Sequence, residues 1–490
     1  MSMQEVVDFF NGLIWSKALI YGCLVVGLYF SVRTRFAQVR HFFGMLRLMM
    51  DGKSSDAGVS SFQALTMALA GRVGTGNIAG VAAAITFGGP GALFWMWMVA
   101  FLGASTAYVE SALAQIYKEK HDGQFRGGPA FYIEKGLGIK WYAILFAFSA
   151  ILACGVLLPG IQANSIADSL KNAMGIDTAV TAAILAVILG FIIFGGVKRI
   201  AKFAEIIVPF MALAYIIIAL VIVVMNIGEL PNVIALIFKS AFGAEAAFGA
   251  VVGLAVEWGV KRGVYSNEAG QGTGPHHAAA AEVQHPAQQG IVQAFSVYVD
   301  TLFVCSATAF MILMTDMYNI QGTLPAGQFL VQHLPADTSI NSPAFTQMAV
   351  SSVFGGFGQI FVAVAVFFFS FTTIMAYYYI AETNVAYLTR SSESPGWLFL
   401  IKLILMFAVT YGAINSSGYI WNMGDVGVGL MAWLNILGIL AIFFMAKPTI
   451  LALSDYEAQQ KAGVSKYTFD PVKLGIRNAK FWEERSKSGK

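Results

Sequence analysis

Charged residues are scarce in this chain, and their scarcity decides its broad class. Asp, Glu, Lys and Arg make up 12% of the 490 residues, whereas hydrophobic residues make up 57%. Because a soluble domain carries about 25% charged residues, an ordinary soluble protein is excluded and a polytopic membrane protein is predicted. The net charge of +3 is too small to indicate a nucleic-acid partner.

Cysteine and histidine are also rare. The three cysteines (Cys23, Cys154 and Cys305) all fall inside apolar runs, where packing in the membrane is their ordinary role. The absence of a His-Glu-x-x-His motif excludes a zinc protease of that type. All six histidines lie in predicted loops, which leaves an intramembrane serine protease without its base. These histidines are His41, His121, His276, His277, His285 and His333.

Long apolar runs are abundant. A transmembrane helix needs about 20 apolar residues, and the sequence offers about eleven candidate spans. The first follows Glu5 and Asp8 and lacks a small-x-small cleavage site, so we expect a retained span rather than a signal peptide. The expected limits are 13–32, 62–87, 90–117, 141–167, 178–196, 200–226, 244–262, 290–316, 355–387, 396–416 and 424–446.

Basic residues follow every second span. They gather after the first, third, fifth, seventh (Lys261 and Arg262), ninth and eleventh spans, whereas segment 317–354 has none and 227–243 has only Lys239. Since cytoplasmic loops carry the excess of Lys and Arg, the N-terminus is predicted outside and the C-terminus inside.

Three connecting segments have a composition of their own. The outer segments 229–243 and 322–352 are semi-apolar, which predicts surface helices or lids. The inner segment 263–289 is rich in Gly and small residues, which predicts a gate or hinge loop rather than a plain linker.

The second span is interrupted at its centre by Gly71-Arg72-Val73-Gly74-Thr75-Gly76-Asn77. A free N–H or C=O in hydrocarbon costs several kcal/mol, so such a break persists only where it lines a cavity or holds a polar ligand. Simple helix packing explains the glycines poorly, because Gly74 and Gly76 cannot share one helix face. A nucleotide loop would require a strand and a βαβ unit, which are lacking. The pattern predicts a discontinuous transporter helix.

The two half-helix ends suit different ligands. The second half begins near Gly76, and its free N–H groups and positive dipole end favour a carboxylate. The first half ends near Val73 with free carbonyls that suit a hard cation such as Na⁺, and Asn77 adds an oxygen ligand. An amino acid and a sodium ion are therefore the expected occupants.

Other polar patches in spans are weaker signals. An inverted repeat predicts a second break about five helices later. The candidate is segment 247–253, which contains Phe248, Gly249 and Val251. Its two glycines also fit simple helix packing. The hydroxyls of Ser370, Thr372 and Thr373 could complete a sodium shell or bond back to their own helix. Segment 159–165, which includes Gln162, lines the substrate site or is a helix end.

Five acidic residues lie near spans. Four of them (Glu110, Glu205, Glu257 and Glu382) fall close to predicted ends, where snorkelling or ion pairing explains them. Asp300 is harder to explain in that way. An acidic residue inside the membrane is costly, so we consider Asp300 a candidate functional residue.

Several of these motifs together resemble the alanine or glycine:cation symporter family, over roughly 60–445. The motifs are Gly71 to Gly80, Ser266-Asn267-Glu268-Ala269-Gly270 with Gly274-Pro275 and His285-Pro286, and Phe369-Ser370-Phe371-Thr372-Thr373 with Tyr378-Tyr379 and Glu382. The resemblance implies a bacterial or archaeal inner-membrane carrier that couples Na⁺, sometimes H⁺, to uptake of small amino acids. It implies an all-α, LeuT-like fold with a five-plus-five inverted repeat and one extra N-terminal helix.

The resemblance also implies site residues. The carbonyls of Ala70, Val73 and Phe369 and the hydroxyls of Thr372 and Thr373 would hold one sodium ion. The substrate would contact Gly74, Thr75, Gly76, Asn77, Gln162, Phe248, Gly249 and Val251, with Asn77 belonging to the substrate or to a second cation position. The chain departs from the family's usual pattern at Phe248, Val251 and Val252, where a denser cluster of small residues is common, and at Ala381 before Glu382.

The predicted organisation has three parts. Residues 1–59 form an N-terminal helix and linker, 60–447 a transport core with repeats 60–227 and 244–447, and 448–490 a cytoplasmic tail. The expected function is sodium-coupled symport of alanine or glycine by alternating access, not enzymatic catalysis. Proton coupling is the main alternative, and an ion channel is a weaker one, since one break per half is not a ring of filter residues. The expected partners are an amino acid and the lipid bilayer, with no nucleic acid and no obligatory protein.

Overall fold

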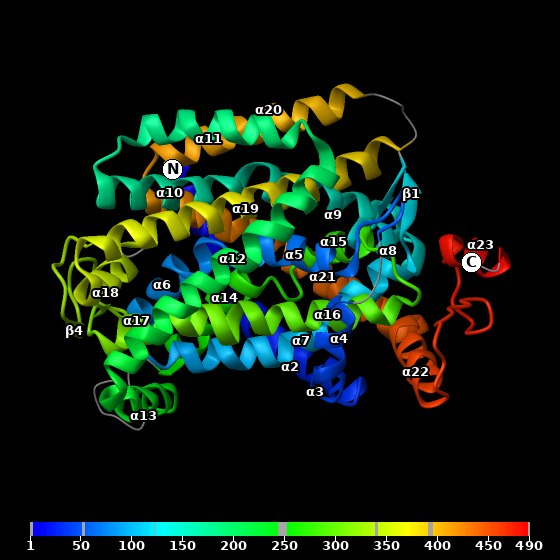
Figure 1. The fold of residues 1–490 in the computed structure, drawn as a ribbon, viewed down its shortest axis with the longest axis horizontal. Coiled ribbons are helices and arrows are strands. Elements are labelled where there is room, and N and C mark those ends of the chain that lie inside the picture. The colour runs from blue at the N-terminus through cyan, green and yellow to red at the C-terminus, as the bar shows by residue number, and fades with distance from the viewer. Residues whose placement is uncertain are drawn as a thin grey trace.

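The computed structural model describes residues 3–50, 54–121, 123–243, 252–338, 342–390 and 395–488 of the chain. Within these residues the fold is helical, with long helices lying side by side in a bundle (Figure 1). The described strands form two short antiparallel pairs, β1 (Glu119–His121) with β2 (Gln124–Arg126) and β3 (Asn319–Ile320) with β4 (Val331–Gln332).

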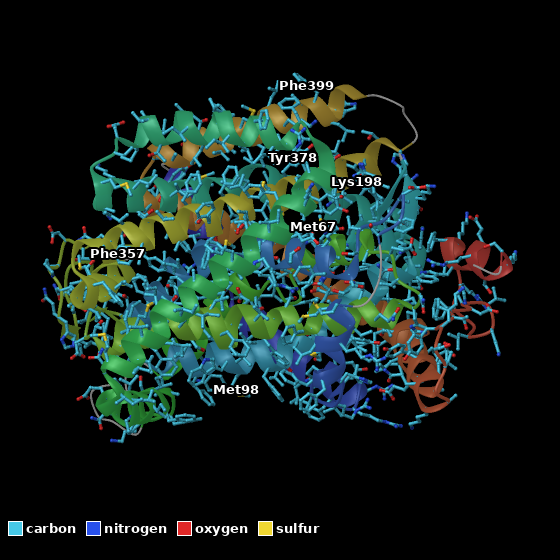
Figure 2. The ribbon with its side chains drawn as sticks, viewed as in Figure 1. Met67, Met98, Lys198, Phe357, Tyr378 and Phe399 are labelled. Carbon is cyan, nitrogen blue, oxygen red and sulfur yellow. The ribbon has the colours of Figure 1, made fainter. Side chains whose placement is uncertain are left out.

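The outer face of the bundle is apolar, as a lipid-facing surface requires. Phe357 and Phe399 point outward and are 57% and 52% exposed, whereas Met67 and Tyr378 lie in the interior (Figure 2). Among the residues that the structure describes, eight helices are long and apolar enough to cross a membrane. This confirms the predicted polytopic all-α class.

The N-terminal region packs against the outside of the core. Helix α1 (Met3–Ile14) lies along α21 (Ser417–Ala446), and α2 (Lys17–Arg33) lies along α7 (Ala92–Ile116). Two short helices, α3 (Ala37–Arg40) and α4 (Phe42–Met50), lead toward the core.

The first half of the core begins with an interrupted helix and continues with long ones. The interrupted element consists of α5 (Ser61–Arg72), the 3-10 turn η1 (Thr75–Asn77) and α6 (Ala79–Gly88). After α7 come α8 (Pro129–Leu137), α9 (Lys140–Leu152), the π-helix η2 (Ala153–Leu157), α10 (Leu158–Met174), α11 (Thr178–Ile193) and α12 (Gly196–Met225).

The second half repeats this plan. Its interrupted element is α14 (Val252–Asn267) followed by α15 (Gly274–Ala280). Then come α16 (Pro286–Tyr298), the π-helix η5 (Val299–Cys305), α17 (Ser306–Met314), α19 (Gly356–Thr389), α20 (Pro395–Ile414) and α21. Between these elements lie η3 (Ile227–Glu229), α13 (Leu230–Ala241) and α18 (Ala344–Phe354). Helix α13 lies within the first of the two semi-apolar segments predicted as surface helices or lids, and α18 begins in the second and ends two residues beyond it.

The predicted limits of the seventh span were wrong. Helix α14 continues to Asn267, and segment 274–280 of the supposed inner loop is a second, fully buried half-helix. Lys261 and Arg262 were taken as a flank in water, but they are 8% and 2% exposed and pair with Asp425. Two adjacent basic residues look the same in the sequence whether they are buried in an ion pair or lie at a helix end in water. The basic pair was therefore taken for the end of the span.

The two ends of the bundle differ in the elements they carry. One end, called the tail end, carries the start of α5, the end of α15, strands β1 and β2 and the C-terminal helices α22 (Pro448–Lys461) and α23 (Lys480–Lys487) (Figure 1). The other end, called the α18 end, carries the end of α6 together with α13 and α18. At the tail end the two half-helices are joined, because Val59 N–H donates to Ala280 C=O at 3.0 Å and Glu282 N–H donates to Val59 C=O at 2.8 Å.

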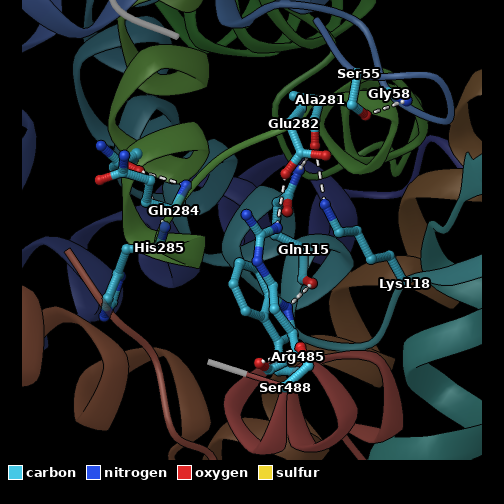
Figure 3. Close-up of polar contacts among 12 residues, drawn as sticks. Ser55, Gly58, Gln115, Lys118, Ala281, Glu282, Gln284, His285, Arg485 and Ser488 are labelled. Atoms are coloured by element: carbon cyan, nitrogen blue, oxygen red, sulfur yellow. Dashed lines mark hydrogen bonds and ion pairs between the residues drawn. The ribbon is translucent and has the colours of Figure 1, made fainter. Parts of the chain in front are cut away.

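Helix α23 covers this junction (Figure 3). Trp482 is 1% exposed, and its indole N–H donates to Gln115 C=O at 2.7 Å. Arg485 pairs with Glu282 at 2.6 Å. The tail therefore contacts the segment that immediately follows α15.

Lys118 lies beneath the same helix. Its ammonium donates to Ala281 C=O at 2.9 Å and lies 4.1 Å from the centre of the Phe125 ring, 4.8 Å from Phe481 and 5.4 Å from Trp482. Burial lowers the pKa of Lys118 to about 7, while the ring faces attract its charged form. The aromatic side chains of α23 therefore cover the Lys118 ammonium, which has little contact with water.

Replacing Trp482 with Ala is expected to detach α23 from the tail end. The change removes a buried ring and a hydrogen bond, and a loss of this kind costs about 3–5 kcal/mol. Amide hydrogen exchange in 480–487 and proteolysis in 462–479 should both accelerate. Val472→Ala, at a residue 65% exposed, is the matched control; equal exchange rates in the two variants would contradict the contact.

Candidate functional site

The first interruption lies where the sequence predicted it. Helix α5 ends at Arg72, Val73 leaves the helical region at ψ 85°, and Gly74 is extended before η1 begins. The break is enclosed by protein, with Val73, Thr75 and Asn77 each 0% exposed. The predicted discontinuous helix is confirmed.

Side chains satisfy the backbone groups that the break leaves free, as an apolar surrounding demands. Gly74 N–H donates to Asn77 Oδ1 at 2.8 Å, and Thr75 N–H donates to Gln162 Oε1 of α10 at 3.0 Å. The Thr75 hydroxyl also lies 2.5 Å from that of Ser165. The structure therefore brings together Gly74, Thr75, Asn77 and Gln162, four of the predicted substrate contacts.

The first break lies against the end of α14. A Cβ atom on Gly76, another predicted contact, would come within 2.9 Å of the Tyr265 ring and 3.3 Å of Ser266 Cα. Only glycine permits this close approach of the two chains.

A second interruption separates α14 from α15, and its position was missed. Glu268, Gly270 and Gly272 have positive φ values of 56°, 82° and 86°. Asn267 and Glu110 hold the free N–H groups of this segment: Ala269 N–H donates to Asn267 Oδ1 at 3.0 Å, and Gly270 N–H donates to Glu110 Oε1 at 3.2 Å. The repeated glycines of 270–274 were the available signal.

The earlier prediction placed this second break at 247–253. Residues 244–251 lie outside the described part of the chain, so Phe248, Gly249 and Val251 cannot be compared with it. Val252 and Gly253 begin the regular helix α14, and the described discontinuity starts at Glu268.

The five predicted sodium ligands lie together between α5 and α19. The Thr373 hydroxyl lies 2.7 Å from Ala70 C=O, 2.9 Å from Phe369 C=O and 3.5 Å from Val73 C=O. The Thr372 hydroxyl lies 2.9 Å from the Phe369 carbonyl. All five residues are 0–1% exposed. Neutral carbonyl and hydroxyl oxygens are the ligands that a hard cation prefers; their role here stays a prediction.

An ion-paired cluster closes the break toward the α18 end. Asp425 of α21 accepts bidentate bonds from Arg262 at 2.9 and 3.1 Å and pairs with Lys261 at 2.8 Å. The Arg262 guanidinium lies 4.8 Å from the centre of the Trp421 ring, and Tyr265 packs on the same ring at 5.3 Å. The break is thus covered on the side of the α18 end.

The acidic residues fall into two groups. Glu382 pairs with Arg126 at 3.3 Å, and Glu205 accepts a bond from Gln63 at 3.0 Å, as expected for acids near helix ends. Glu110 was assigned to the same class, but it is 0% exposed and holds the second break. Asp300 is also 0% exposed and lies beside the first break.

Gly74→Ala is expected to destabilise the protein, whereas Gly80→Ala is its tolerated control. A Cβ on Gly74 would lie 2.5 Å from Thr373 Oγ1 and 2.9 Å from Gln162 Oε1, but one on Gly80 would meet Trp421 at an ordinary 3.8 Å. Overpacking of this kind costs about 1–3 kcal/mol. Thermal unfolding in detergent measures it; equal midpoints for the two variants would contradict the close approach.

Comparison with known proteins finds a matching family model and several relatives. A family model described as "Sodium:alanine symporter family" matches residues 1–470. The chain is 61% identical over 482 residues to a putative sodium/proton-dependent alanine carrier protein, YrbD, of Bacillus subtilis (98% of each chain). It is 53% identical over 439 residues to a sodium/proton-dependent alanine carrier protein of Bacillus sp. PS3 (90% of this chain, 97% of the other).

A more distant relative and a solved structure extend the comparison. The sodium/alanine symporter AgcS of Methanococcus maripaludis is 35% identical over 450 residues (90% of this chain, 95% of the other). The structure of a Na⁺-coupled sialic acid symporter aligns with 98% of each chain at a TM-score of 0.51 and 15% identity. At that identity the likeness shows the fold alone, and the fold is the LeuT-like one that was predicted.

Proposed function

Since the chain belongs to the sodium:alanine symporter family, we propose that it couples entry of Na⁺ to uptake of alanine or glycine by alternating access. One observation carries the proposal: a single enclosed break offers backbone N–H groups on one side and clustered neutral oxygens on the other. A zwitterion and a hard cation are the ligands that match these two sides.

The substrate carboxylate would bind at the start of η1. The N–H groups of Gly74 and Thr75 now bond to Asn77 and Gln162, and a carboxylate would take the place of these amide oxygens with a stronger, charge-assisted bond. Gly76 lies against Tyr265 and Gly74 against Thr373, so the space near the break is narrow. This supports a small side chain on the substrate. Phe248, Gly249 and Val251 complete the proposed substrate set by family resemblance.

The cation would join α5 to α19. Carbonyls of Ala70 and Val73 come from the half-helix before the break, whereas Phe369, Thr372 and Thr373 belong to α19. A cation that binds only where these elements meet stabilises that arrangement, because a ligand shifts an equilibrium by its differential affinity for the two states. Na⁺ would thereby order the break that receives the amino acid.

Proton coupling is the second candidate, since the relatives at 61% and 53% identity are named sodium/proton-dependent carriers. An ion channel is less well supported, because a filter needs rings of repeated ligands. We further propose that the chain lies in the inner membrane with the N-terminus outside, and that the tail end and residues 448–490 face the cytoplasm. No protein partner is required by this mechanism.

Competition against labelled alanine tests the substrate class. In proteoliposomes, glycine and alanine are expected to inhibit uptake, and leucine or phenylalanine to inhibit weakly, because bulky side chains clash near Gly74 and Gly76. Each competitor is measured with Na⁺ and with choline. Equal inhibition by large and small amino acids would contradict the narrow site.

Thr372→Ala combined with Thr373→Val is expected to abolish sodium stimulation of uptake. The double variant removes two hydroxyl ligands while the helix is kept. Thr389→Val, which removes a hydroxyl bonded to Val385 on the same helix, is the matched control. Uptake against Na⁺ concentration is the measurement, and an unchanged sodium dependence in the double variant would remove the cation assignment.

A further inference from the structure

The exposed apolar surface of α2 continues past the end of the span. On α2 the exposed apolar residues recur every three or four positions, as the lipid-facing side of a helix requires. The same spacing continues through α3 and α4, although the span ends at Arg33. The residues of this apolar stripe are Tyr21, Val25, Leu28 and Val32 on α2 and, beyond it, Phe36, Val39, Phe43, Leu46 and Met50.

The other side of α3 and α4 packs on the protein. Ala37, Met45 and Leu48 are buried, and α4 lies against α16 and α5. Phe43 and Met50, in contrast, are 83% and 73% exposed. Because a large exposed apolar surface marks a contact with a membrane or another molecule, this outer side of the two helices needs an apolar partner.

The chain turns sharply between α2 and α3. Arg35 and Phe36 have positive φ values of 54° and 53°, which residues with a side chain rarely adopt. The Arg40 guanidinium holds the turn, since it donates to Arg35 C=O at 2.7 Å and to Thr34 C=O at 3.1 Å. It also pairs with Glu457 of α22 at 2.8 Å. The turn keeps α3 and α4 at the end of the span, where Figure 1 shows them in blue at the edge of the bundle between α2 and α22.

Three arginines beside the stripe have no polar partner in the described part of the protein. Arg33, Arg35 and Arg47 are exposed, and among the described residues none of their guanidinium groups forms a hydrogen bond or an ion pair. A guanidinium group matches a phosphate with two parallel N–H···O bonds. A helix with exposed apolar residues and basic residues beside them is typical of the membrane interface.

We propose that α3 and α4 form a binding surface for anionic phospholipids in the leaflet at the tail end. The apolar stripe would enter the boundary between headgroups and acyl chains, and Arg33, Arg35 and Arg47 would bind the lipid phosphates around it. A bilayer fits this surface better than a protein partner, because the stripe is continuous with the lipid-facing side of α2. The inference goes beyond the proposed transport activity and holds whichever compartment the tail end faces.

The first test is thermal unfolding of the full-length protein in detergent with added phosphatidylglycerol or phosphatidylcholine. A lipid that binds only the folded protein raises the unfolding midpoint. Phosphatidylglycerol should do so at the lower concentration, since each arginine near an anionic headgroup contributes about a fivefold gain in affinity. Arg33→Gln, Arg35→Gln and Arg47→Gln together should weaken its binding about a hundredfold and leave that of phosphatidylcholine unchanged. Arg47→Gln alone should weaken it about fivefold, and it serves if the triple variant does not fold.

The matched control removes three positive charges from the tail. Arg477, Lys480 and Lys487 are exposed and lie in or beside α23, and changing all three to Gln should preserve the preference for phosphatidylglycerol. Equal stabilisation of the wild type by the two lipids would overturn the proposal. An equal loss of preference in the control variant would overturn it as well, because the effect would then follow net charge and not this surface.

The second test measures the depth of the stripe in a bilayer. A spin label attached at Phe43→Cys should be accessible to oxygen and shielded from a water-soluble nickel chelate, whereas one at Val472→Cys in the tail should show the reverse. The native cysteines are buried, so the label goes to the introduced thiol. Equal exposure to nickel at the two positions would contradict the lipid contact. A label at Phe43→Cys shielded from both reagents, with spin–spin broadening, would also overturn the proposal, because a second copy of the chain would then cover the stripe.

Discussion

A peptide group inside a membrane needs a hydrogen-bond partner, and this chain leaves several of them outside any regular helix. Side chains supply the partners: amides from Asn77, Gln162 and Asn267 and the carboxylate of Glu110 hold the N–H groups of the two breaks. Regular secondary structure would satisfy these groups permanently. An amide side chain that accepts from these N–H groups can be displaced by a ligand with a stronger acceptor, such as a carboxylate.

The two ends of the bundle are closed by different forces. Toward the α18 end, Asp425 joins Lys261 and Arg262 across α14 and α21. At the tail end, aromatic packing on Lys118 and the indole of Trp482 hold the C-terminal helix over the start of α5 and the end of α15. Because Val59 is hydrogen-bonded to Ala280 and Glu282, these two half-helices are mechanically joined there. A rearrangement that opens the tail end must separate this pair or move both helices together.

How far the sequence predicted this arrangement depended on how local each signal was. The first break was predicted because Gly74, Gly76 and Asn77 interrupt one apolar run within a few residues. The neutral cation cluster needed the family motif at 369–373, because its two halves are about three hundred positions apart along the chain. The described break that begins at Glu268 was not predicted, because Lys261 and Arg262 have the composition of a cytoplasmic flank. Their partner Asp425 is 163 positions away, so no local pattern reveals that they are buried.

Because the three native cysteines are buried, their reactivity can report on opening of the protein without any substitution. Cys23, Cys154 and Cys305 are all buried in the closed arrangement, and the Cys305 sulfur lies 3.3 Å from Asn77 Nδ2 and 3.2 Å from Ser266 Oγ. Any movement that admits water to the first break also admits a small alkylating reagent to that thiol. The rate of Cys305 alkylation, followed by mass spectrometry, therefore records how often the break opens, with no engineered label in the protein.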